Sequence, residues 1–200
     1  MTLRVYLVRH GETAWSLSGQ HTGRTDIPLT KRGEQKAREL GQRLGTVKFS
    51  RVLTSPRQRA RRTCELALGT MPEIEPDLAE WDYGDYEGQR SADIRKTRAD
   101  WNIFRDGCPG GESPAQISAR VDGLIDRLKP MNGNVGLFSH GHLGRVLAAR
   151  WIGLPIIEAQ HFVLNTASVS ILGFEHDRAD MPAILLWNAC SEVESPNSRT

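Results

Sequence analysis

Residues 7–11 read Leu-Val-Arg-His-Gly, and residues 137–141 read Leu-Phe-Ser-His-Gly. Each stretch starts in a short apolar run that is typical of a buried strand and continues into a His-Gly pair. Ligands bind open α/β sheets beyond the carboxyl ends of the strands. If the two strands are parallel neighbours, His10 and His140 face each other across that crevice. The two stretches therefore predict both the centre of a sheet and the place of a site.

Strand-like and helix-like segments alternate along the chain. The expected strands are 5–8, 52–54, 135–138, 168–174 and 183–187. The expected helices are 30–44, one that opens at 55, one from 113 to about 130, and 141–152. Such alternation predicts an α/β domain with a largely parallel sheet.

Two of these helices begin with the same signal. Residues 55–58 and 113–116 both read Ser-Pro-x-Gln. This order favours Ser at the N-cap, Pro at the first helical position and Gln at the third. We therefore expect Ser55 and Ser113 to cap the helices that follow them.

The chain is expected to form a single domain over residues 1–200. The segment 81–111 is the least regular part and is rich in Gly, Asp and aromatic residues. It is interpreted as a lid or specificity insert rather than as part of the core. The polar tail 195–200 is expected to fray.

Composition excludes several functional classes. The 26 Lys and Arg nearly balance 24 Asp and Glu, giving a net charge of +2, which argues against a nucleic-acid binder or a polybasic membrane anchor. No apolar run approaches the roughly 20 residues of a membrane span, and no secretory signal is visible. The three cysteines form no C-x-x-C pair. We expect a cytoplasmic protein that binds neither nucleic acid nor membrane, with a homo-oligomer possible.

Arginine accounts for 21 of the 26 basic residues, and some stand where an anion would bind. Arg9 precedes the first His-Gly pair. Four more fall in the first turns of the helix opening at Ser55: Arg57, Arg59, Arg61 and Arg62. Cations there oppose the helix dipole unless an anion is present. We expect Arg59 to meet that anion, and Arg57 and Arg61 to be solvated.

Proton transfer needs a carboxyl group, and Glu80 is the favoured candidate. Aromatic residues follow it at 81, 83 and 86, and they would remove water from around its carboxyl group. Asp82, Asp85 and Glu87 remain alternatives on sequence alone. No Asp group has Mg²⁺-ligand spacing, no P-loop is present, and His140 and His142 are too closely spaced for a convincing metal pair. We expect no metal.

Two histidines, two arginines and one carboxyl group suit phosphoryl transfer through a covalent phosphohistidine. A neutral imidazole attacks phosphorus, while guanidinium groups and the second histidine hold the phosphoryl oxygens. The carboxylic acid protonates the leaving alkoxide and then activates water.

These residues resemble the histidine phosphatase (phosphoglycerate mutase-like) superfamily. The resemblance starts at 7–13, Leu-Val-Arg-His-Gly-Glu-Thr, and continues through 22–30, 55–63 and 139–142. It implies a three-layer sandwich with helices on both faces of the sheet. It also implies the following catalytic set: His10 as nucleophile, Arg9, Arg59 and His140 as phosphate pocket, and Glu80 as proton donor.

Residues 15–23, 80–88 and 101–108 are similar to those of sugar-phosphate phosphatases, including sedoheptulose-bisphosphatase-like enzymes. By that similarity Arg145, five residues after His140, could hold a second phosphate. That branch often has Tyr at the position of His21, which leaves the substrate open. The predicted substrate-binding residues are Gly11, Glu12, His21, Thr22, Gly23, Tyr83, Gly141 and Arg145.

The sequence thus predicts a metal-independent phosphatase that needs no cofactor and hydrolyses small phosphorylated sugars or polyols. A cofactor-dependent phosphoglycerate mutase is the main alternative. Such mutases usually carry a longer insert, whereas only about 50 residues separate Glu80 from the strand before His140. A phosphoprotein phosphatase and a non-catalytic phosphate-binding protein remain further alternatives, although all five catalytic positions are filled.

Overall fold

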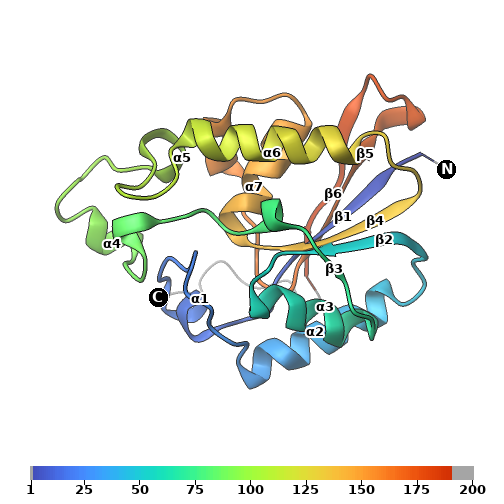
Figure 1. The fold of residues 1–200 in the computed structure, drawn as a ribbon, viewed down its shortest axis with the longest axis horizontal. Helices are drawn as coiled ribbons and strands as arrows, with labels where there is room; N and C mark the ends of the chain where they lie inside the picture. Colours follow the sequence, from blue (N-terminus) through green and yellow to red (C-terminus); the bar gives the residue numbers. More distant parts are fainter. Residues whose placement is uncertain (1, 191–200) are drawn as a thin grey trace.

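A six-stranded sheet forms the centre of the computed structural model, which describes residues 2–190 (Figure 1). The strands are β1 (Arg4–Arg9), β2 (Phe49–Thr54), β3 (Glu73–Ile74), β4 (Asn134–Ser139), β5 (Val169–Phe174) and β6 (Pro182–Ala189). Their order is β3-β2-β4-β1-β5-β6. The first four are parallel where they pair, and β5 and β6 are antiparallel. The expected largely parallel sheet is confirmed.

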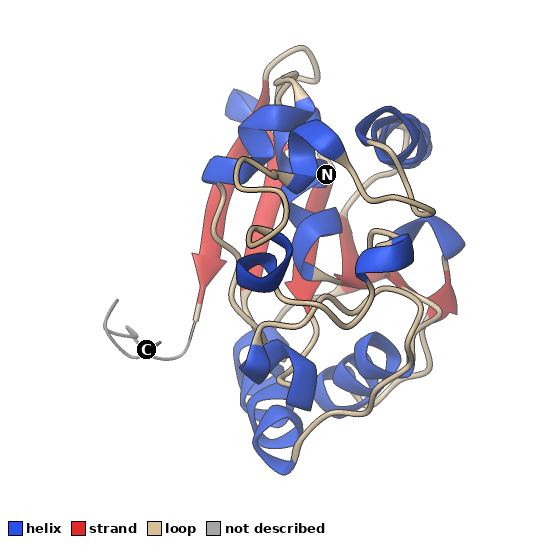
Figure 2. Cartoon of the chain, turned by 90° about the vertical axis from the view of Figure 1, so that its left-hand side faces the viewer, coloured by secondary structure: helices blue, strands red, loops and turns tan. Residues whose placement is uncertain are grey.

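Helices cover both faces of the sheet, as Figures 1 and 2 show. One face carries α2 (Lys31–Leu44) and α3 (Gln58–Leu68), and the other carries α6 (Pro114–Leu128) and α7 (Gly141–Trp151). Alternate side chains of a strand point to opposite faces. Leu7 accordingly packs in the hydrophobic cluster that holds the α6 and α7 residues, and Val8 packs with α2 and α3. The three-layer sandwich is confirmed.

Of the two predicted serine N-caps, the one at α6 is correct and the one at α3 is wrong. Ser113 caps α6 in a capping box with Gln116, as expected. Ser55 does not cap α3, which begins at Gln58. The backbone N–H of Gln58 donates to Asp26 Oδ1 (2.9 Å) instead, so a carboxylate from another loop takes the capping role. The Ser55 hydroxyl is left for other contacts.

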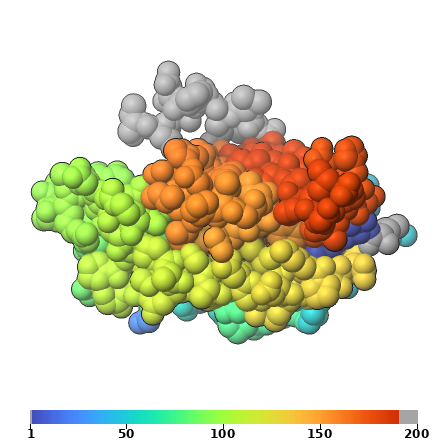
Figure 3. Space-filling view, turned by 90° about the horizontal axis from the view of Figure 1, so that it is seen from above, coloured from blue at the N-terminus to red at the C-terminus, as the bar shows by residue number. Residues whose placement is uncertain are grey.

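The segment 81–111 is irregular, but it is part of the core. It contains short helical turns: η2 (Gly84–Tyr86), α4 (Ser91–Ile94) and α5 (Ile103–Asp106). Trp81, Trp101 and Phe104 are buried in the same cluster as the inner faces of α6 and α7. The prediction that this segment lies outside the core is wrong, because its aromatic side chains join the core. The segment forms one end of the molecule (Figure 3, green).

The remaining helical elements are short: α1 (Ala14–Ser18), η1 (Pro76–Leu78), η3 (Ile156–His161) and η4 (Glu175–Asp177). All three cysteines are free. Between residues 2 and 190, no helix combines the length and apolar character required to cross a membrane. The tail 195–200 lies outside the described residues.

Candidate active site

The two His-Gly pairs meet at the carboxyl ends of β1 and β4. These strands are parallel neighbours in which Leu7 pairs with Leu137 and Arg9 with Ser139, so the histidines follow in the same register. The rings of His10 and His140 are buried, with centroids 5.2 Å apart. The structure brings the two histidines together as the sequence predicts.

His10 is held in a form that can act as a nucleophile. Its Nδ1 lies 2.6 Å from the carbonyl oxygen of Gly11, so Nδ1–H donates and Nε2 keeps its lone pair. Burial, and then the positive charges of Arg59 and Arg9, hold the pKa of His10 well below its ordinary value. The ring is therefore neutral at physiological pH.

Arg59 enters the site from the first turn of α3. It is fully buried, and burial lowers its pKa. Its guanidinium donates to the carbonyl oxygens of Thr22 (2.7 Å) and Thr25 (3.1 Å), while its Nε is buried without a hydrogen-bond partner in the described structure. No described carboxylate forms an ion pair with it. Such a guanidinium suits an anionic ligand.

Arg9 and Gly141 lie against each other beside His10. Arg9 donates from Nη1 to the carbonyl oxygen of Leu164. A Cβ on Gly141 would lie 3.3 Å from Arg9 Cζ, so glycine leaves the room that this guanidinium needs. Both residues line the cavity that opens beside His10.

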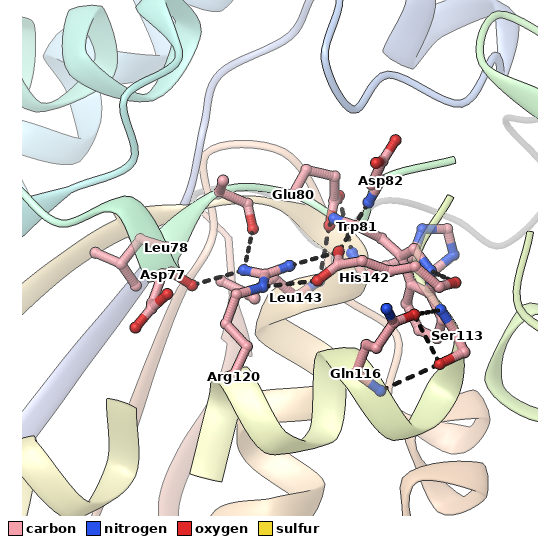
Figure 4. Close-up of polar contacts among 12 residues, drawn as sticks. Asp77, Leu78, Glu80, Trp81, Asp82, Ser113, Gln116, Arg120, His142 and Leu143 are labelled. Atoms are coloured by element: carbon pink, nitrogen blue, oxygen red, sulfur yellow. Dashed lines mark hydrogen bonds and ion pairs between the residues drawn. The ribbon is translucent and has the colours of Figure 1, made fainter. Parts of the chain in front are cut away.

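Glu80 lies at the amino end of α7 (Figure 4). Its Oε1 accepts from the backbone N–H of Trp81 (2.9 Å) and Leu143 (2.8 Å), and its Oε2 accepts from that of His142 (3.0 Å). Neighbouring aromatic residues were expected to dominate its surroundings. Three backbone N–H donors surround the carboxyl group instead, and they fix its position at the start of α7.

A partly buried ion pair holds the segment that carries Glu80. The Arg120 guanidinium pairs with Glu112 (2.8 Å) and donates to the carbonyl oxygens of Asp77 and Ala79 (2.7 and 2.8 Å) (Figure 4). Glu112 also accepts from the backbone N–H of Asp82 (2.9 Å). These contacts fix the chain on both sides of Glu80.

A cavity of about 300 Å³ opens beside His10. Eight predicted site residues line it: Arg9, His10, His21, Thr22, Glu80, Tyr83, Gly141 and Arg145. Arg59 and His140 are buried next to His10 rather than on the cavity wall.

Three residues predicted to bind substrate do not line this cavity. Gly11 is packed on Gly33, since a Cβ at Gly11 would lie 2.6 Å from the Gly33 carbonyl oxygen. Glu12 accepts a hydrogen bond from Thr30 Oγ1 (2.6 Å). The Gly23 N–H donates to the Glu87 carboxylate (2.9 Å). These contacts support the loops around the site.

An aromatic cluster forms part of the cavity wall. His21 stacks on Tyr83 with 4.6 Å between centroids, and the Tyr83 hydroxyl lies 2.7 Å from His142 Nδ1. Burial lowers the pKa of His21 to about 4, and it also lowers that of His142. From the sequence, His142 is a member of the 139–142 motif and a rejected metal ligand, and it is assigned no role in the site. Its position two residues after His140, at the start of a helix, is the signal that could have identified it.

Arg145 lines both the cavity of about 300 Å³ beside His10 and a neighbouring one of about 380 Å³. It donates to the carbonyl oxygens of Ala159 (3.0 Å) and Gln160 (2.8 Å), and its Cζ lies 4.7 Å from the Phe104 ring centroid. Burial, and then the charge of Arg9, lowers its pKa to about 10. It remains a cation at neutral pH.

No group of three His, Cys, Asp or Glu side chains among residues 2–190 is placed to hold a metal ion. The positive charges that face the cavity beside His10 come from Arg9 and Arg145.

Residues 5–189 match the sequence model of the histidine phosphatase superfamily (branch 1). The chain belongs to this superfamily. The predicted family and the predicted enzyme class, a phosphoric monoester hydrolase of the histidine phosphatase type, are confirmed.

Relatives of this histidine phosphatase carry different names. It is 45% identical to an acid phosphatase of Mycobacterium tuberculosis over 86% of this chain and 87% of that one. It is 32% identical to sedoheptulose 1,7-bisphosphatase of Saccharomyces cerevisiae, covering 93% of each chain. It is also 31% identical to a protein of Salmonella choleraesuis named "Probable phosphoglycerate mutase", over 88% and 87%.

Solved structures give the same fold. The structure of an open-reading-frame product of Mycobacterium tuberculosis superposes with a TM-score of 0.90 at 40% identity, covering 96% of this chain and all of that one. The phosphoglycerate mutase-like architecture is confirmed.

Proposed function

We propose that this histidine phosphatase is a cytoplasmic, metal-independent enzyme that hydrolyses small phosphorylated sugars or polyols through a phosphohistidine on His10. One observation carries the proposal. The His10 ring is neutral, donates from Nδ1 to the Gly11 carbonyl, and has two guanidiniums lowering its pKa. A neutral imidazole beside fixed positive charge suits attack on a phosphate ester.

In the first step, the lone pair of His10 Nε2 attacks phosphorus and the bond from phosphorus to the ester oxygen breaks. Protonated Glu80 gives its proton to the leaving alkoxide. Arg9, Arg59 and His140 bind the phosphoryl oxygens as charge spreads over them. In the second step, the Glu80 carboxylate takes a proton from water, which attacks phosphorus and releases inorganic phosphate and free His10.

The cavity supports a small, polar substrate. It is about 300 Å³ in volume and combines arginine, histidine and hydroxyl side chains with the ring of Tyr83. Such a wall can donate to several hydroxyl groups of a sugar. The names of two relatives, a sedoheptulose bisphosphatase and an acid phosphatase, are consistent with this class.

A phosphoglycerate mutase is the second candidate, because several relatives are named "Probable phosphoglycerate mutase". A mutase must keep water from the phosphohistidine and return the phosphoryl group to its substrate.

A phosphate-release screen tests the proposal. It covers sugar mono- and bisphosphates, polyol phosphates, phosphoglycerates and a phosphopeptide, with an isomerisation assay on the phosphoglycerates in parallel. Release from sugars or polyols without isomerisation supports the proposal. Isomerisation without release selects the mutase, preference for the phosphopeptide selects a protein phosphatase, and neither activity selects a binding protein.

Arg145→Ala is expected to lower kcat/KM more for a sugar bisphosphate than for the matching monophosphate, by about tenfold. The guanidinium faces the cavity and would contact a second phosphate, and a charged hydrogen bond contributes about 1.5–3 kcal/mol. The measurement is the ratio of kcat/KM in the wild type to that in Arg145→Ala, determined once for the bisphosphate and once for the monophosphate. Equal losses on both substrates would show that Arg145 does not contact the distal phosphate.

EDTA is expected to leave kcat within about twofold of its untreated value. The positive charge that stabilises the transition state is covalently part of the chain, on Arg9 and Arg59. Phosphate release is measured before and after dialysis against the chelator. Loss of activity that Mg²⁺ restores would contradict this expectation.

A further inference from the structure

The two ring nitrogens of His140 have different surroundings. Nε2 lies 2.7 Å from the Ser55 hydroxyl oxygen. Nδ1 is buried and has no hydrogen-bond partner in the described structure, although the whole residue is inaccessible to solvent. A buried polar atom without a partner is costly, and at a site it points to a ligand that supplies the missing contact.

The contacts of Ser55 determine which nitrogen carries the proton. Ser55 Oγ already accepts a hydrogen bond from the backbone N–H of Arg57 (3.2 Å). If Nε2 were protonated, it would donate to the same oxygen, and the buried Ser55 hydroxyl proton would have no acceptor in the described structure. If the Ser55 hydroxyl donates to Nε2, both groups are satisfied. The His140 proton then resides on Nδ1.

Ser55 is free for this contact because α3 starts late. The helix begins at Gln58, and Asp26 takes the capping role that the sequence assigns to serine. The strand β2 ends directly before Ser55, and the Ser55 backbone N–H donates to the Phe138 carbonyl (2.9 Å). Both backbone and side chain therefore attach Ser55 to the segment that carries His140.

We propose that Ser55 is a positioning residue that holds His140 as the Nδ1–H tautomer, so that Nδ1–H donates to an oxygen of the transferring phosphoryl group. The inference rests on the proposed function and deepens it. His140 stays neutral because burial, and then the charge of Arg59, lower its pKa. A neutral ring in the other tautomer would present a lone pair to the phosphate and repel it.

Nuclear magnetic resonance of the full chain, labelled with ¹⁵N in its histidine rings, tests the tautomer directly. We expect the His140 proton on Nδ1 in the wild type, with its resonance shifting when inorganic phosphate is added. In Ser55→Ala we expect a mixture of tautomers, a kcat about tenfold to a hundredfold lower, and weaker inhibition by inorganic phosphate. Ser55→Thr keeps the hydroxyl and should restore the wild-type tautomer.

Ser139→Ala is the matched control, since it also removes a buried hydroxyl next to His140. The Ser139 hydroxyl donates to the Leu78 carbonyl (2.8 Å) and not to the ring. In Ser139→Ala, the tautomer of His140 should match that of the wild type. A proton on Nε2 in the wild type, or an unchanged tautomer in folded Ser55→Ala, overturns the proposal. The wild-type spectrum decides the case if Ser55→Ala does not fold, and it is independent of whether any sugar phosphate is hydrolysed.

Discussion

His10→Ala is expected to reduce phosphate release by at least about a thousandfold. The substitution removes Nε2, the atom that forms the bond to phosphorus, and no other side chain in the site replaces it. Arg9 and Arg59 remain, so the variant should still bind inorganic phosphate. Steady-state release and alkaline-quench trapping of the acid-labile phosphoenzyme measure the loss of catalysis. Calorimetric titration with inorganic phosphate measures the retained binding.

His176→Ala is a suitable control for that experiment. His176 is exposed on η4, and its only recorded pairing in the described structure is with Glu175 at 3.7 Å. This variant should keep both turnover and the phosphoenzyme. Turnover near the wild-type level in folded His10→Ala would contradict the proposed nucleophile.

Lowering the pH from 6.5 to about 4 is expected to destabilise the folded protein substantially. The pKa values of His10, His21, His140 and His142 are all lowered by burial. Below pH 6.5 the unfolded chain therefore binds more protons than the folded one. The free energy of unfolding decreases as the pH is lowered. This stability is fully present above 6.5. For His21 alone, whose pKa is about 4, the loss across the window is about 3 kcal/mol.

His21→Phe isolates one of these groups. Phenylalanine can keep the stacking on Tyr83 but has no proton to gain. The charges near His21 oppose each other, because Glu87 raises its pKa and Arg95 lowers it, so burial decides the direction. Chemical denaturation at pH 7, 5 and 4 should show that the free energy of unfolding depends less on pH in this variant. His176→Phe is the exposed control, and an equal slope in all three proteins would refute the assignment.

The strands and the first catalytic pair could be predicted because they depend on local pattern. Short apolar runs predict β1 and β4. The His-Gly pair after each run predicts that the two histidines lie side by side at one edge of the sheet if the strands are parallel neighbours. Arg59 was also predictable, since a cation in the first turn of a helix is unfavourable without an anion.

Other features depend on partners that are distant in the sequence. Ser55 has the local sequence pattern of an N-cap, but the backbone N–H of Gln58 donates to Asp26 instead. The Ser55 hydroxyl contacts His140, which is 85 residues away in the sequence. Gly11 and Gly23 lie within family motifs, yet tight packing and loop contacts account for them. No single-sequence pattern gives these distances.

The aromatic residues of 81–111 show the same limit. Their mixture with Gly and Asp suggests a surface segment, whereas Trp81, Trp101 and Phe104 are buried once α6 and α7 are in place. Only the tertiary arrangement reveals that these rings complete a core.

The double role of that segment constrains how the substrate range of such an enzyme can diverge. Tyr83 belongs both to the cavity wall and to the core, so a substitution that reshapes the pocket there also removes packing. Trp15 and Ser91 are partly exposed and line the same cavity without belonging to a buried hydrophobic cluster. Substitutions at these two positions can therefore change binding at a smaller cost in core packing than a substitution of Tyr83.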